Sequence, residues 1–150
     1  MLLQTTDKKD IFIDKEHAFK SIFLRNIFEI EPCSDPVEVL IDSKTMKEIH
    51  EFMKKDKHVL EKDFNPLEIN FSYEFLECFD HLSMSELLCV CNAANYLEYP
   101  FLLELCCKQL AIRISQGPEI LKSEILGDSR ITDDDFERIT TDFEWLDGNL

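Results

Sequence analysis

The sequence predicts an α+β fold, in which a small sheet of three short strands near the N-terminus is covered by helices. Two apolar runs, "MLLQTT" at 1–6 and "IFI" at 11–13, flank the polar "DKKD" and indicate a hairpin. The stretch "VEVLID" at 37–42 begins in apolar and polar alternation and is β-branched, which is typical of a third strand. Much of the remaining chain repeats apolar residues at helical spacing, so helices must cover this sheet and one another.

One helix is expected between the hairpin and the third strand. Ala18, Ile22, Phe23 and Ile27 recur at helical spacing and predict a helix over 17–29. The following "PCSDP" interrupts it, because each proline disfavours helix in the residue before it.

A second helix, over 44–57, is predicted directly after the third strand. Ser43 is its candidate N-cap, since a serine hydroxyl accepts from an unpaired backbone N–H of the first turn. Lysines in the last turn complement the helix dipole. The apolar face consists of Met46, Ile49 and Met53, with Phe52 at its border.

A polar stretch at 56–70 predicts a loop, and helices follow it. "YEFLECFDHL" resumes the helical pattern, and Ser83 or Ser85 is the candidate cap of the next helix, "SELLCVCNAANYL". A short joint at Tyr99-Pro100 separates that helix from one over 101–115.

Two further helices are predicted at the C-terminal end. Gly117-Pro118 suits a helix end followed by a new helix start. "EILKSEIL" forms the first, and "TDDDFERITTDFEWL" the second. Its acidic run lacks the alternating ligands and glycine turn of a calcium loop and is typical of a solvated helix start.

Composition limits the class of protein. Of 150 residues 45% are hydrophobic, with 12 Phe against 3 Gly and 5 Pro, which indicates a helix-rich globular chain. No apolar run reaches the roughly 18 residues of a membrane helix, and the N-terminus lacks a secretory signal pattern. We expect an intracellular protein. Its net charge of −15 argues against nucleic-acid binding and favours a partner with a basic face.

No catalytic or cofactor motif is evident. Four scattered histidines and six cysteines form no pair at metal-ligand spacing, and no nucleophile elbow or Gly-rich phosphate loop is present. Reduced, mostly buried thiols are the favoured interpretation, and a zinc site assembled across two helices is the alternative. The sequence therefore predicts no enzyme and no cofactor.

The apolar residues beyond Gly117 have few partners within so short an extension. They either pack back onto the domain or form an open groove that an amphipathic helix of another chain would complete. These residues are Ile120, Leu121, Ile125, Leu126, Ile131, Phe136, Ile139, Phe143 and Trp145.

The stretch "AANYLEYPFLLELCCKQLA" at 93–111 resembles the Skp family, the F-box-binding adaptors of SCF ubiquitin ligases, in which an "AANYLD" helix leads into an "LLD…CK.VA" helix. "QGPEIL" and "ITDDDFERITTDFEW" are similar to the family's turn and closing helix, including Trp145. The resemblance is strong from about Phe75 onward and looser before it. Relatives such as elongin C, or a generic BTB/POZ oligomerisation domain, end before this tail.

The resemblance implies a BTB/POZ-like core over 1–100, facing a cullin, and F-box-binding helices over 101–150. The implied cullin-binding residues are Asn95, Tyr96, Ile49, Phe52 and Met53. The implied F-box-binding residues are Leu102, Leu103, Leu105, Cys106, Ile120, Ile125, Ile139 and Trp145. For Tyr96, Leu103, Leu105 and Cys106 a role in the core is the alternative, and Trp145 is either an anchor in a groove or a clasp onto its own domain.

The sequence differs from the family in detail. The acidic loop after the first helix is reduced to "EIEPCSD", and "PEILKSEILG" differs from the corresponding family motif.

The resulting hypothesis is a non-catalytic adaptor in cytoplasm and nucleus. Its partners are F-box proteins and a cullin, with no nucleic acid, membrane or small-molecule substrate. An elongin C-like or BTB oligomeric adaptor is the first alternative, and a thiol- or zinc-dependent enzyme the second.

Overall fold

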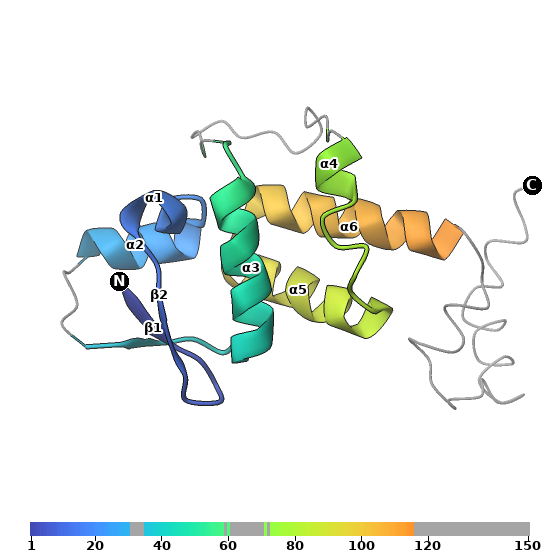
Figure 1. The fold of residues 1–150 in the computed structure, drawn as a ribbon. Helices are drawn as coiled ribbons and strands as arrows, with labels where there is room; N and C mark the ends of the chain where they lie inside the picture. The colour runs from blue at the N-terminus through green and yellow to red at the C-terminus, as the bar shows by residue number, and fades with distance from the viewer. Residues whose placement is uncertain (31–34, 59, 61–70, 72, 116–150) are drawn as a thin grey trace, which may run out of the picture. The chain divides into compact units, whose positions relative to one another are not determined.

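The computed structural model describes residues 1–30, 35–58, 60, 71 and 73–115. Helices and strands follow one another as β1 (Leu2–Gln4), β2 (Asp10–Phe12), α1 (Lys15–Ala18), α2 (Ile22–Ile30), β3 (Val37–Glu38), α3 (Ser43–Lys55), α4 (Tyr73–Leu76), α5 (Met84–Tyr96) and α6 (Pro100–Ser115) (Figure 1). The predicted α+β class is confirmed. The described residues all belong to one compact unit, Met1–Gln116, and the two helices predicted beyond Gly117 lie outside them.

The three strands form one sheet in the order β2-β1-β3. β1 pairs antiparallel with β2 and parallel with β3, so Leu3 lies between Ile11 and Val37. Leu3 and Ile11 are buried, whereas Leu2 and Phe12 face outward, because successive side chains of a strand alternate between its two faces. The predicted hairpin and third strand are confirmed, although β3 is shorter than 37–42.

The single helix expected over 17–29 is divided into α1 and α2 by a break at Phe19–Ser21. Asp14 caps α1 by accepting from the His17 N–H at 3.0 Å. Ser21 acts similarly for α2, because its hydroxyl oxygen accepts from the Leu24 N–H at 3.1 Å. The same hydroxyl donates to the Leu97 carbonyl, so a tertiary contact fixes this break.

The N-cap of α3 is Asp42 and not Ser43 as predicted. The Asp42 carboxylate accepts from the backbone N–H groups of Lys44 and Thr45 at 2.9 and 3.0 Å. The Ser43 hydroxyl instead donates to Asp7 at 2.7 Å, which ties the start of α3 to the hairpin turn. The hydrogen bonds that Asp42 accepts hold its pKa below the ordinary value, and the bond from the Thr45 hydroxyl is the largest cause.

α3 is the central helix of the described unit. In Figure 1 it runs between the sheet with α1 and α2 on one side and the pair of α5 and α6 on the other, and it contacts both α1 and α5. Its apolar side chains are consequently buried in one continuous core: Met46, Ile49, Phe52 and Met53.

The helix expected over "YEFLECFDHL" is a single turn, α4, followed by hydrogen-bonded turns. The Arg113 guanidinium on α6 donates to the carbonyl oxygens of Phe79 and Leu82 at 2.6 and 2.7 Å. It thereby provides these two backbone carbonyls with a side-chain hydrogen-bond donor. Among the described helices, none combines the length and apolar character needed to cross a membrane.

Candidate functional site at the α5–α6 joint

α5 begins with a capping box, as the pattern at Ser83 predicts. The Ser83 hydroxyl oxygen accepts from the Glu86 N–H at 3.3 Å, and the Glu86 carboxylate accepts from the Ser83 N–H at 2.9 Å. Glu86 also forms an ion pair with Lys44 on α3. The Lys44 ammonium and the Ser83 groups together lower the pKa of Glu86 to about 2.

α5 ends in a Schellman motif. The Tyr99 N–H bonds to the Ala94 carbonyl at 2.9 Å, and the Glu98 N–H bonds to the Asn95 carbonyl at 3.0 Å. Glu98 has a φ of 49°, the left-handed conformation that this motif requires at the residue after the cap. Pro100 then starts α6, where its missing N–H leaves no bond unmade. The predicted joint at Tyr99-Pro100 is confirmed.

Tyr99 fixes this joint to the end of α3. Its side chain is buried, and its hydroxyl donates to the buried Asp56 carboxylate at 2.5 Å. Burial, together with the adjacent Asp56 charge, raises the pKa of the Tyr99 hydroxyl, so the group is a protonated donor. Asp56 also accepts from the His58 N–H at 2.8 Å, so several partners satisfy its charge.

The start of α2 docks against the same joint. The Ile22 N–H donates to the Glu98 carbonyl at 3.0 Å, and the Phe23 N–H donates to the Leu97 carbonyl at 3.3 Å. The first N–H groups of a helix have no partner within the helix, so the carbonyls of the joint satisfy them here. Three helices, α2, α5 and α6, are therefore held together at one point.

Two of the five predicted cullin-binding residues lie at the surface of this joint. Asn95 is exposed, and Tyr96 is half-buried with its ring 5.2 Å from that of Phe23. Ile22, which the sequence did not single out for this role, is 37% exposed next to them. We call Asn95, Tyr96 and Ile22 the joint patch.

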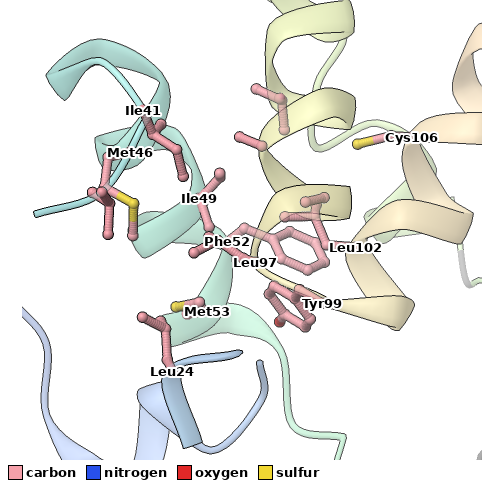
Figure 2. Close-up of a cluster of buried hydrophobic side chains, with 14 of the residues drawn as sticks. Leu24, Ile41, Met46, Ile49, Phe52, Met53, Leu97, Tyr99, Leu102 and Cys106 are labelled. Carbon is pink, nitrogen blue, oxygen red and sulfur yellow. The ribbon is translucent and has the colours of Figure 1, made fainter. Parts of the chain in front are cut away.

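The other three, Ile49, Phe52 and Met53, are buried in the core, as Figure 2 shows. The Phe52 ring lies 6.0 Å from the ring of Tyr99 and 6.1 Å from that of Phe101. Helices and sheet cover α3 from both sides, so these three side chains present no surface to another protein. A sequence pattern identifies an apolar helix face but does not tell whether the partner of that face is intramolecular.

The predicted F-box-binding residues on α6 also point mainly inward. Leu102, Leu105 and Cys106 are fully buried, and Leu103 is half-buried against the core. For Leu105 and Cys106, the alternative of a role in the core therefore agrees with their buried positions. The remaining four, Ile120, Ile125, Ile139 and Trp145, lie outside the described residues.

The opposite side of α6 is apolar as well, and of its residues the sequence prediction assigned only Leu103 to partner binding. Cys107, Ala111 and Ile114 are exposed, and Leu103 and Leu110 are half-buried. These residues follow the spacing i, i+4, i+7, i+8 and i+11, which places them along one face of a helix. We call this set the outer face of α6. Of these five side chains Leu103 and Leu110 pack against the core, whereas Cys107, Ala111 and Ile114 are exposed.

The thiols are less buried than the sequence suggested. Among the five described cysteines only Cys106 is buried, while Cys89 and Cys107 are exposed. Burial is the main cause that raises the pKa of the Cys91 thiol to about 11, and a hydrogen bond with the Cys107 thiol adds to it. Within the described ranges, no three His, Cys, Asp or Glu side chains are grouped so that they could hold a metal ion.

Comparison with known proteins gives a weak similarity over nearly the whole chain and no family assignment. No protein-family model matches the chain. The chain is 24% identical over 152 aligned residues to a Talaromyces marneffei protein described as E3 ubiquitin ligase complex SCF subunit sconC. That alignment covers 97% of this chain and 95% of the fungal protein, so the similarity is not confined to the "AANYL" region.

Proposed function

We propose that this chain is a non-catalytic adaptor of an SCF-type ubiquitin ligase, which bridges an F-box substrate receptor and a cullin scaffold through a BTB/POZ-like core. The outer face of α6 is the observation that carries the proposal, because apolar side chains exposed in a row along one helix face are typical of a binding surface. The full-length similarity to an SCF subunit supports the class of complex.

The F-box receptor binds through the outer face of α6. Leu103, Leu110 and Ile114 accept the apolar side of a helix from the receptor, as in helix-in-groove recognition. Full burial of each such side chain contributes roughly 1.5–3 kcal/mol. Ile120, Ile125, Ile139 and Trp145 remain predicted contacts of the receptor, with Trp145 as an aromatic anchor.

The cullin binds at the joint patch. Tyr96 combines an apolar ring with a polar hydroxyl, and Asn95 offers an amide that both donates and accepts, which suits a specific contact. The Schellman motif and the docked start of α2 hold this patch in one conformation, so binding does not require prior ordering of the backbone.

The adaptor role is geometric. The two surfaces lie on adjoining helices of one compact unit, so their separation is fixed by the packing of α5 on α6. Holding a receptor at a fixed distance from a scaffold raises the effective concentration of the receptor's substrate near the ligation machinery. The bond-forming chemistry belongs to other subunits.

Co-purification with one F-box peptide and with one cullin N-terminal domain tests the proposal. Leu110→Asp with Ile114→Asp, and separately Trp145→Ala, are expected to weaken F-box binding at least about 10-fold, because a charge or a gap enters the apolar contact. Asn95→Lys with Tyr96→Lys is expected to weaken only cullin binding. Leu40→Asp is the matched control, since Leu40 is 79% exposed and lies on neither surface.

The outcomes separate the proposal from its alternatives. Failure of the unaltered chain to bind either partner overturns it. A stable homo-oligomer that binds a cullin without residues 117–150 favours the elongin C-like or BTB oligomeric alternative. Stoichiometric bound zinc, or rapid thiol labelling at neutral pH that abolishes a measured activity, favours the enzyme alternative.

A further inference from the structure

We propose that the cavity between α1, α2 and the C-terminal end of α3 binds a small anion with at least two phosphate groups. The cavity measures about 910 Å³, and five basic residues line it: Lys15, Lys20, Arg25, Lys54 and Lys57. Among the described residues, the acidic ones that line it are Glu16 and Asp56. This site is separate from both proposed protein-binding surfaces and does not depend on the adaptor role.

The local charge is opposite to that of the protein as a whole. The chain has 31 acidic and 16 basic residues and a net charge of −15. Within the part of the chain that the structure describes, the cavity lining nevertheless contains five of those basic residues and two of the acidic ones. A concave surface lined by charges of one sign concentrates the field and attracts ions of the opposite sign.

Lys20 is a buried cation that no described carboxylate neutralises. Its side chain is 8% exposed, and its ammonium donates to the backbone carbonyl oxygens of Asp56 and His58. Carbonyl dipoles partly solvate an ammonium group but leave its net charge in place. A buried charge without a charged partner is unfavourable, so an anion in the cavity would stabilise this arrangement.

Arg25 and Lys57 also lack an ionic partner among the described residues. The Arg25 Nε is buried without a hydrogen-bond partner, and across the part of the chain that is described its guanidinium makes no ion pair. Lys57 likewise has no ion pair with any described residue. The Asp56 carboxylate is already engaged by the Tyr99 hydroxyl and the His58 N–H, so little of its acceptor capacity remains for these cations.

The remaining two lysines are only weakly engaged. Lys54 pairs with Glu51 at 2.5 Å, and both side chains are largely exposed. The Lys15 ammonium lies 5.2 Å from the centre of the Phe19 ring and is available to a stronger partner. Exposed ion pairs contribute little, so an anion can replace these contacts.

The arrangement suits phosphate in particular. A guanidinium offers a planar fork of donors that matches phosphate oxygens in a bidentate manner, and lysine ammonium groups act as additional point charges. The cavity volume falls within the range of roughly 300–1,000 Å³ of small-molecule sites. The five cations and two carboxylates of the described lining leave a net charge of +3, which exceeds the charge of about −2 on a single phosphate group, so an anion with two or more phosphates is expected.

Titration of the full-length chain with inorganic pyrophosphate tests this proposal, with binding measured by calorimetry and by backbone amide NMR shifts. We expect saturable binding with a Kd below about 1 mM at roughly 50 mM ionic strength. The shifts should be confined to residues around 15–25 and 53–58.

Two charge-removing variants and a matched control complete the design. Arg25→Gln is expected to weaken binding at least about 10-fold, and Lys57→Gln about 3-fold, since each removes one cation from the cavity. Lys47→Gln removes an exposed lysine of α3 that does not line the cavity, and it should leave Kd within about 2-fold. Lys57 is exposed, so its variant stays informative even if Arg25→Gln does not fold. Absence of saturation up to about 10 mM, or an equal loss in Lys47→Gln, overturns the proposal.

Discussion

Asp56 shows how one residue at the end of α3 organises its surroundings. Its carboxylate is buried, yet it accepts hydrogen bonds from Tyr99 and from His58, and its backbone carbonyl accepts from Lys20. A buried carboxylate is tolerated only where such partners replace water. The residue therefore connects the break between α1 and α2, the end of α3 and the α5–α6 joint through hydrogen bonds rather than through apolar contact.

Tyr99→Phe is expected to lower the free energy of unfolding by about 1–3 kcal/mol, because it leaves the buried Asp56 carboxylate with one partner fewer. Urea unfolding followed by circular dichroism measures this difference. Tyr96→Phe is the matched control, since the Tyr96 hydroxyl has no hydrogen bond to any described residue, and it should change stability by less than about 0.5 kcal/mol. Equal effects of the two variants would show that the bond to Asp56 does not stabilise the fold.

At the level of elements, the connection between α5 and α6 combines two devices. The Schellman motif ends α5 with a residue in the left-handed conformation, and Pro100 starts α6 two residues later. Glycine is the usual residue at the left-handed position, because a Cβ crowds the following carbonyl there. This chain has Glu98 at the left-handed position instead. The N–H groups at the start of α2 donate to the carbonyls of the joint and hold its backbone in this conformation.

Glu98→Gly is therefore expected to stabilise the protein by up to about 1 kcal/mol, as the relief of left-handed strain exceeds the entropy lost by glycine on folding. Glu98→Ala keeps the Cβ and should leave stability nearly unchanged. Thermal unfolding of both variants beside the unaltered chain gives the comparison. If Glu98→Gly unfolds at a lower temperature than Glu98→Ala, the strain at this position is negligible.

For the whole molecule, several carboxylates tie separate elements together. Asp7 links the hairpin turn to α3, Asp42 caps α3, and Glu86 joins α5 to α3. The pKa of each lies below its ordinary value; the largest causes are the Ser43 hydroxyl for Asp7, the Thr45 hydroxyl for Asp42 and Lys44 for Glu86. The folded protein consequently binds fewer protons than the unfolded chain in mildly acidic solution, so stability rises with pH there.

The stability contributed by Glu86 should be fully present above its ordinary pKa of 4.5 and be lost as the pH falls towards about 2. Urea midpoints measured between those two pH values should fall less steeply for Glu86→Gln than for the unaltered chain. Glu77→Gln, on an exposed residue with no ion pair to any described residue, serves as the control. Parallel slopes in all three proteins would contradict a folded-state shift at Glu86.

Local sequence rules predicted much of the fold. The hairpin, the existence of α3, α5 and α6, the cap at Ser83 and the joint before Pro100 all follow from apolar spacing, polar caps and proline geometry within a few residues of each element. The break between α1 and α2 did not follow, because the Ser21 hydroxyl that helps to fix it bonds to Leu97, far along the chain. The cap at Asp42 was missed for a similar reason, since Asp7 engages Ser43.

The sequence by itself determined the fold class, the order of most elements and the acidic character of this protein, because these depend on composition and on neighbouring residues. Only the tertiary structure decided which apolar faces remain open. Ile49, Phe52 and Met53 are covered, whereas Cys107, Ala111 and Ile114 are not, although both sets follow helical spacing. The physical reason is that burial depends on what packs against a helix, and residues distant in the sequence supply that packing.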